Sequence, residues 1–338
     1  MLVAATDDAE IHLRQLRGGP VTVLERGPTL RGESHGIASL LRELGIVATA
    51  VADADFELQR FGVTLIGGNA NWYPRALEQL TAAAQSERGF VVIWHWEPLP
   101  YPGVAGLPRP RLHAREHAKV LLRDSRATDP HTNARRLRRL ARRGLPDLLV
   151  VSNAGGREYL AEIGLRSNHV PLGYHPIQGR DLGIERDIDV VFIGALDVPR
   201  RKRALRALRR GGVAVEAAGG WGNKRVAGDP RTELLNRAKI VLNLSRHEGQ
   251  FSGARLSLGM ANRALVISEP MFRPEPFVPG VHYVEAPLDE MVGVVERYLA
   301  DPEAREKIAT RGHDFVTTEL SQVRSLARIV ELISGLHG

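Results

Sequence analysis

The stretch Lys239–Pro287 constrains the fold of this chain more than any other part of the sequence. Ile240–Leu244 and Ala264–Ser268 are short apolar runs rich in β-branched residues, which is typical of buried strands. A glycine-containing loop, Glu248–Gly253, and a segment with helical character, Ala254–Asn262, lie between them. The order strand, loop, helix, strand predicts one right-handed βαβ unit, and therefore a parallel sheet.

The loop in this unit favours a bound phosphate. It follows a strand and precedes a helix that Ser252 can cap, where backbone N–H groups converge and the helix dipole favours negative charge. Gly249 and Gly253 would let the backbone approach a ligand closely. Arg246 and Arg255 flank the loop and can neutralise phosphate charge. The alternative is an ordinary strand-to-helix turn whose arginines are solvated.

Length and composition exclude several classes of protein. The 338 residues are enough for about two domains. The chain has no cysteine, so it has neither disulfides nor a thiolate metal site. No apolar run reaches the roughly 18 residues of a membrane span, and the first twenty residues lack the apolar core of a signal peptide. We therefore expect a cytoplasmic enzyme.

Charge raises a second question, since the formal net charge is +7 and arginine dominates the basic residues. This balance suits a nucleic acid, an anionic membrane or a phosphate-bearing substrate. No nucleic-acid-binding module is recognisable, so no nucleic-acid partner is expected. The segment 133–143 (NARRLRRLARR) is intensely basic and predicts either a solvated helix face or a peripheral contact with anionic lipid. Such a contact would place the protein at the inner face of the membrane.

The central stretch and its continuation carry a family resemblance. Matching residues are Ser245, Glu248-Gly249, Ser252-Gly253 and Val266–Pro270, followed by FVPGVHY at 277–283. In this pattern the chain resembles the donor-sugar domain of GT-B glycosyltransferases of the "glycosyl transferases group 1" type, over about Val190 to Val316.

This resemblance implies an α/β fold of the GT-B type, with two Rossmann-like domains facing a central cleft. The expected boundaries are 1–175 for an N-terminal acceptor-side domain and 188–315 for a nucleotide-sugar donor domain. A C-terminal helix within 316–338 would pack back on the first domain, as GT-B chains often do.

The resemblance also implies a donor site. Glu248 would contact the donor sugar, and Arg201 and Lys202 would clamp the diphosphate near a helix N-terminus. Gly194 follows a strand of this domain, and Trp221 would stack on the base or close the cleft. Cationic side chains would then stabilise the leaving diphosphate, so neither a metal nor a cofactor is expected beyond the nucleotide-diphosphate sugar.

One position departs from the family pattern. Classical members hold the nucleotide ribose with a second glutamate, seven residues beyond the first. Here that position is Leu256 or Leu258, depending on the loop alignment, and neither side chain can accept a hydrogen bond from a hydroxyl. Either ribose recognition differs in this chain, or the chain is a divergent branch whose donor the motif does not identify.

Acceptor-site candidates follow from the strand ends of the first domain, which would face the cleft in a GT-B enzyme. They are Glu33, Ser34, His35, Asn69, Trp72, His95 and Glu97. His35 is a candidate general base, because the unperturbed pKa of histidine is about 6.5. A retaining reaction would not require a protein base.

The predicted function is metal-independent transfer of a sugar from a nucleotide-diphosphate sugar to an unknown acceptor, which could be a small molecule, a glycan or a lipid-linked compound. A nucleotide-sugar epimerase and a non-catalytic nucleotide-sugar-binding subunit are the alternatives. The pattern His113-x-x-Glu116-His117 matches an inverted zinc-protease motif, but no third ligand is evident, and the polar face of a helix explains it better.

Overall fold

The computed structural model describes residues 20–25, 36–112, 114–122, 129–196, 198–219 and 227–335. The chain forms two compact units, each built on one parallel sheet. The first unit comprises Met1–Pro102, Arg111–Leu172 and Gln322–Gly338. The second comprises Gly103–Pro110 and Gly173–Ser321.

The sheet of the first unit has the order β2-β1-β3-β4-β5-β6, and its strands are parallel. Its strands are β1 (Val21–Leu24), β2 (Ala48–Val51), β3 (Val63–Gly67), β4 (Phe90–His95), β5 (Leu148–Val151) and β6 (Asn168–His169). Strands β1, β3, β4 and β5 are almost wholly buried, which is why they read as continuous apolar runs.

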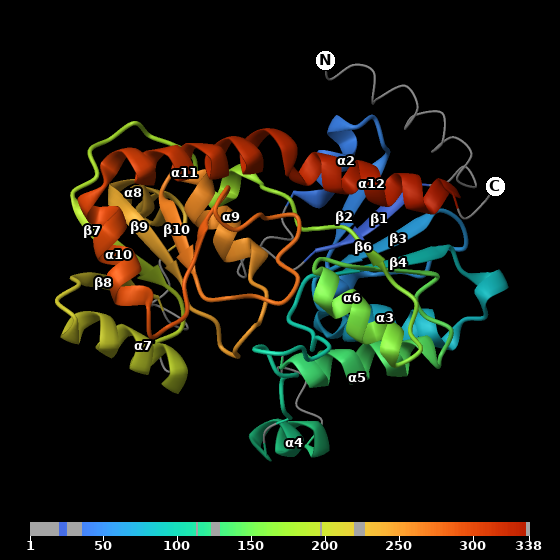
Figure 1. The fold of residues 1–338 in the computed structure, drawn as a ribbon. Coiled ribbons are helices and arrows are strands. Elements are labelled where there is room, and N and C mark those ends of the chain that lie inside the picture. The colour runs from blue at the N-terminus through green and yellow to red at the C-terminus, as the bar shows by residue number, and fades with distance from the viewer. Residues whose placement is uncertain are drawn as a thin grey trace. The chain divides into compact units, whose positions relative to one another are not determined.

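Helices cover both faces of this sheet (Figure 1). They are α2 (Ile37–Glu43), α3 (Pro74–Ala82), α5 (Pro130–Ala141), α6 (Ala154–Glu162) and α12 (Gln322–Gly335), whereas α4 (Ala114–Leu121) contacts α5 and lies away from the sheet. Neighbouring strand residues point to opposite faces, so Leu65 packs with α2 and α12 while Ile66 packs with α3, α5 and α6. The last helix of the chain thus contributes to the core of the first unit.

The second unit repeats this plan with the strand order β11-β10-β9-β7-β8, again parallel. Its strands are β7 (Ile188–Ile193), β8 (Val215–Ala218), β9 (Ala238–Asn243), β10 (Leu265–Ser268) and β11 (Val284–Glu285). Its helices are α7 (Pro199–Arg210), α8 (Asp229–Arg237), α9 (Gly253–Ala261), α10 (Met291–Ala300) and α11 (Pro302–Asp314). A π-helical turn, Phe315–Glu319, follows α11.

The predicted α/β class with two parallel sheets is confirmed. The strands and helices at the predicted βαβ unit begin and end within two residues of their expected places. The last strand of the first unit was expected at 170–174, whereas β6 lies directly before that segment. Strand β11 was not predicted, because two residues are too few to show any periodicity. Among the helices that the structure describes, none is long and apolar enough to cross a membrane.

Replacing Ile329 of α12 by alanine tests the contribution of the last helix to the first unit. Ile329 is buried against α2 and the sheet, so its loss leaves a cavity that should cost about 2–5 kcal/mol of unfolding free energy. Urea unfolding followed by circular dichroism should show a lower midpoint. Arg328→Ala is the matched control, because Arg328 is exposed on the same helix. Equal midpoints for both variants would contradict the packing of α12.

Candidate functional site

The carboxyl edge of the second sheet is where a ligand-binding site is expected. After β7 the chain turns to one side to form β8, and it then returns past β7 to form β9, so β7 and β9 flank a topological switch point. Ligands of open parallel sheets bind outside the strand ends at such a point. Gly194 directly follows β7, and a Cβ on it would approach Phe192 to 2.9 Å. The Phe192 ring is therefore packed closely against Gly194.

Two arginines converge at this switch point. Arg201 of α7 is buried and donates from Nε to the carbonyl of Leu244 at 2.8 Å, just beyond β9. Arg255 of α9 donates to Asn243 Oδ1 at 2.7 Å. Both guanidinium groups lie over the Phe192 ring, 5.5 and 6.0 Å from its centroid. The sheet edge thus carries two positive charges that backbone carbonyls and an amide hold in place.

Burial, together with the nearby charge of Arg246, lowers the pKa of Arg255 to about 10, while Glu269 opposes the shift. The group still carries its charge at neutral pH. Because a partly desolvated cation interacts more strongly with an anion than a solvated one does, this edge suits a phosphate.

A buried carboxylate organises the same edge. Glu269, directly after β10, is 2% exposed and forms an ion pair with Arg200 of α7. Its second oxygen accepts the backbone N–H of Ser245 at 3.0 Å. Burial raises the pKa of the Glu269 carboxyl, and the charge of Arg200 opposes that shift. Sequence reasoning did not select Arg200 or Glu269 as site residues, although Glu269 lies in the Ser-Glu-Pro pattern at the end of a predicted strand.

The glycine-containing loop uses its glycines at positions where a larger residue would be strained or crowded. Gly249 has a φ of 67°, in the left-handed region that favours glycine, and its carbonyl accepts the N–H of Phe272 at 2.9 Å. Gly253 begins α9, and a Cβ there would approach the Phe251 ring to 2.7 Å. Ser252 occupies the N-cap position, but its side chain makes no capping hydrogen bond, so the predicted side-chain cap is wrong.

Other donor-site candidates lie on the surface of the second unit. Lys202, Arg246 and Glu248 are exposed. Leu256 is fully buried in an apolar cluster and Leu258 is half-buried in another, so neither side chain offers a polar group to a ribose. Trp221 lies outside the described residues.

The first unit has a corresponding edge at Gly67-Gly68-Asn69, where β3 ends. A Cβ on Gly67 would approach Trp96 to 2.6 Å, and one on Gly68, whose φ is 84°, would approach Trp72 to 2.4 Å. Both indole rings are half-buried against the core clusters. Asn69 is buried, where its side chain donates to Asn133 of α5 at 3.0 Å and accepts the N–H of Asn71.

His95 ends β4 and is 2% exposed. Burial lowers the pKa of His95 to about 4, although the backbone of Gly68 and Glu97 opposes part of the shift. Neither ring nitrogen has a partner in regular hydrogen-bond geometry among the described residues. The imidazole is therefore neutral at physiological pH. Glu97 is half-buried two residues further on.

The remaining candidates of the first unit take no part in a described site. Glu33, Ser34 and His35 lie outside the described residues. Glu116, the glutamate of the zinc-protease-like pattern, is buried and accepts the backbone N–H of Thr132 at 3.1 Å. It anchors the start of α5. Glu116 lies on a helix, as expected, but its side chain is buried and not on a solvated polar face. The described residues contain no group of three histidine, cysteine or acidic side chains placed to hold a metal ion.

Replacing His95 tests whether its imidazole is neutral in the folded protein. Below pH 6.5 the unfolded chain takes up a proton at this residue, whereas the folded chain does so only near pH 4. The free energy of unfolding should therefore fall by about 3 kcal/mol through this group between pH 7 and pH 4. His95→Gln should flatten that part of the stability profile, measured by urea unfolding, whereas His117→Gln at an exposed position should not. An unaltered slope in His95→Gln would exclude a buried neutral imidazole.

Comparisons with known proteins bear on the family and the fold of the chain. Residues 200–331 match the family model described as "Glycosyl transferase-like". No curated protein matches the sequence.

Several solved structures are similar to this chain in fold. Anabaena Alr3699/HepE, in complex with UDP and glucose, has a TM-score of 0.60 at 13% identity, over 99% of this chain and 97% of that chain. Sucrose-phosphate synthase from Thermosynechococcus elongatus has a TM-score of 0.63 at 12% identity, over 94% and 99%. TarM has a TM-score of 0.56 at 9% identity, over 81% of this chain and 55% of that chain. A further similar structure is that of S. aureus TarM.

The similar structures share their fold with this chain across nearly its whole length, and the family model covers its second unit from α7 onwards and continues into α12. The resemblance inferred from the sequence is thereby confirmed: residues 200–331 match a glycosyl transferase-like family model, and the chain has the GT-B fold of these structures.

Proposed function

We propose that this enzyme binds a nucleotide-diphosphate sugar at the carboxyl edge of its second unit and transfers the sugar to an acceptor. The observation that carries the proposal is the pair Arg201 and Arg255, held over Phe192 at the switch point between β7 and β9. Fixed cations at this place suit a diphosphate, whose two charged groups bridge neighbouring donors.

The diphosphate would be neutralised by side chains rather than by a metal. Arg201 and Arg255 are preorganised by carbonyl and amide partners, so they need little rearrangement when charge develops on the leaving group. Lys202 follows Arg201 in the sequence, and Arg246 follows Ser245 after β9. Both side chains are exposed and would bind the phosphates from the solvent side. Glu269 would act indirectly, by holding Arg200 and the backbone at Ser245.

The loop would hold the other parts of the donor. Gly249, Ser252 and Gly253 bring backbone close to the start of α9, where N–H groups favour an anion, while Gly194 keeps the end of β7 open to a ligand. Glu248 would contact the donor sugar, because it is exposed at the start of this loop. Stacking of the base on Trp221 stays a prediction of the sequence.

The acceptor would be bound by the first unit. At the edge after β3 and β4, half-buried Trp72 and Glu97 are the candidates for direct contact. Asn69 and His95 are buried, which favours a role in positioning this edge. A general base at His35, flanked by Glu33 and Ser34, stays a prediction, as does a peripheral membrane contact through residues 133–143.

The donor base can be identified by a thermal-shift screen with UDP, GDP, dTDP and CDP. UDP is the first candidate, because the similar HepE structures contain UDP or UDP-glucose. A ligand that binds only the folded protein raises its melting temperature, and a specific response should name the base. No response to any nucleoside diphosphate would contradict the proposed donor site.

Replacing Lys202 by glutamine tests the diphosphate clamp. Loss of one charge-assisted contact should weaken nucleoside-diphosphate binding about tenfold, equivalent to roughly 1.4 kcal/mol, in calorimetric titration. Arg203→Gln is the matched control, because it removes the same charge from the next exposed position of α7. If both variants bind as the unaltered protein does, Lys202 does not contact the phosphates.

Replacing Glu248 by glutamine tests its contact with the donor sugar. Nucleoside-diphosphate affinity should stay within twofold, while kcat should fall about 100-fold if the contact strengthens in the transition state. Release of nucleoside diphosphate from the donor to water measures turnover without a known acceptor. Unchanged turnover would show that Glu248 does not contact the donor sugar. The thermal-shift screen tests the donor site independently of this result.

A further inference from the structure

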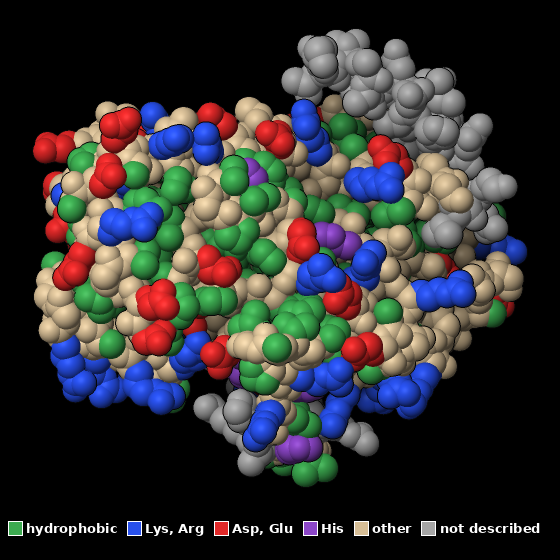
Figure 2. All heavy atoms as spheres, in the orientation of Figure 1, with side chains coloured by type: hydrophobic (Ala, Val, Ile, Leu, Met, Phe, Trp, Pro, Cys, Tyr) green, Lys and Arg blue, Asp and Glu red, His purple; other side chains and the backbone are tan. Residues whose placement is uncertain are grey.

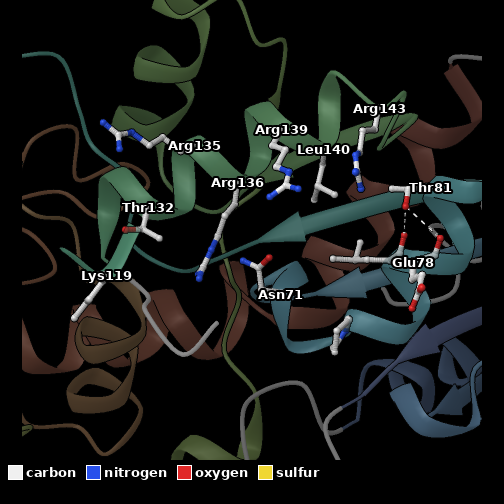
Figure 3. Close-up of a pocket in the computed structure, with 12 residues that line it drawn as sticks. Asn71, Glu78, Thr81, Lys119, Thr132, Arg135, Arg136, Arg139, Leu140 and Arg143 are labelled. Carbon is white, nitrogen blue, oxygen red and sulfur yellow. Dashed lines mark hydrogen bonds between the residues drawn. The ribbon is translucent and has the colours of Figure 1, made fainter. Parts of the chain in front are cut away.

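A basic pocket lies in the first unit, on the outer side of α3 and α5 (Figure 3). Its volume is about 490 Å³, within the range of small-molecule sites. The lining residues come from α3, α4, α5 and the turns next to them: Asn71, Pro74, Leu77, Glu78, Thr81, Lys119, Thr132, Arg135, Arg136, Arg139, Leu140 and Arg143. The proposed donor site uses none of them.

The pocket has a strong excess of positive charge. Five of its lining residues are cations, whereas Glu78 is its only acid. Lys119 is neutralised by Asp129 at 2.7 Å. No carboxylate of the described residues forms an ion pair with Arg135, Arg139 or Arg143. Figure 2 shows the Lys and Arg side chains gathered over this part of the first unit.

The arrangement of these arginines is costly without a ligand. Helix α5 carries four arginines and no acidic residue. Arg135 and Arg139 are four residues apart, about 6 Å along the axis, and Arg143 follows in the turn after the helix. Like charges at this spacing destabilise a helix by about 0.2–0.5 kcal/mol per pair. An anion bound along the row would attract each guanidinium group and offset this repulsion.

The pocket is also held in shape. Helix α5 packs into the core through Leu137 and Leu140, and Leu140 also lines the pocket with Leu77. Arg136 reaches towards Asn71 (Figure 3), and with the amide oxygen of Asn71 facing it the Arg136 Nε–O distance is 2.9 Å. This contact connects α5 to the turn before α3. The two sides of the pocket are therefore held at a fixed distance.

We propose that this pocket binds a ligand carrying two or more linked phosphate groups. Guanidinium groups bind phosphate oxygens in pairs, and their repetition along α5 fits several anionic groups better than one. The ligand is either a soluble polyphosphorylated compound or the headgroup of a lipid that carries a diphosphate, which share this chemistry. The proposal does not rest on the proposed glycosyl transfer, because binding needs no donor sugar.

The test compares two pairs of substitutions on the same helix. Arg139→Gln with Arg143→Gln removes two charges from the pocket, and Arg138→Gln with Arg142→Gln removes two exposed charges that do not line it. Glutamine keeps most of the side-chain length and the helix propensity. Melting temperatures without anion verify that both variants are folded.

The probe is inorganic tripolyphosphate, titrated by calorimetry at low ionic strength with the donor site saturated by the nucleoside diphosphate that binds there, if one does. The pocket pair should lose at least tenfold in affinity, while the control pair should lose no more than about threefold through the general field. Absence of binding to the unaltered protein overturns the proposal. An equal loss in both pairs, or no loss in the pocket pair, overturns it as well.

Vesicles distinguish the two sources of the ligand. Co-sedimentation with phosphatidylcholine vesicles, with and without diacylglycerol diphosphate, is measured for the same variants. Binding that requires diacylglycerol diphosphate and is lost only in the pocket pair assigns the site to a lipid headgroup. If tripolyphosphate binds in the pocket and vesicles do not, the ligand is soluble. Vesicle binding lost equally in both pairs, without tripolyphosphate binding, reflects diffuse charge and overturns the proposal.

Discussion

The hydrogen bond from Arg201 to the carbonyl of Leu244 is central to the second unit. It joins the first turn of α7 to the residue after β9, across the point where the strand order changes direction. A buried guanidinium must satisfy its donors, and here the residues that follow the strands supply the acceptors. The same requirement places Arg255 on Asn243 and Arg200 on Glu269. A structural need for buried hydrogen bonds therefore concentrates positive charge where a parallel sheet receives its ligands.

The main elements of the fold could be predicted from the sequence because their signals are local. Buried parallel strands such as β9 and β10 appear as short β-branched runs, and a glycine loop between strand and helix is recognisable from its composition. These inferences require only the neighbours of each residue along the chain.

The candidate site was harder to predict because its contacts join distant residues. Arg200 and Glu269 lie 69 positions apart, and nothing local distinguishes Arg200 from the other arginines of α7. Likewise, Asn69 and His95 follow strands as ligand-binding residues do, yet the structure buries both in the packing of the first unit. Position along a strand predicts which edge a side chain reaches, whereas its exposure depends on what the rest of the chain places above it.

The packing of α12 has a consequence for the order in which the protein is made. Apart from Gly103–Pro110, the second unit is one continuous stretch, Gly173–Ser321, and its residues leave the ribosome before those of α12. The first unit needs Leu326, Ile329, Val330 and Ile333 to complete the face of its sheet beside α2. During synthesis, the second unit can therefore finish its core while the first, although it begins earlier, still exposes apolar surface. The part of the protein that starts first is the part that is completed last.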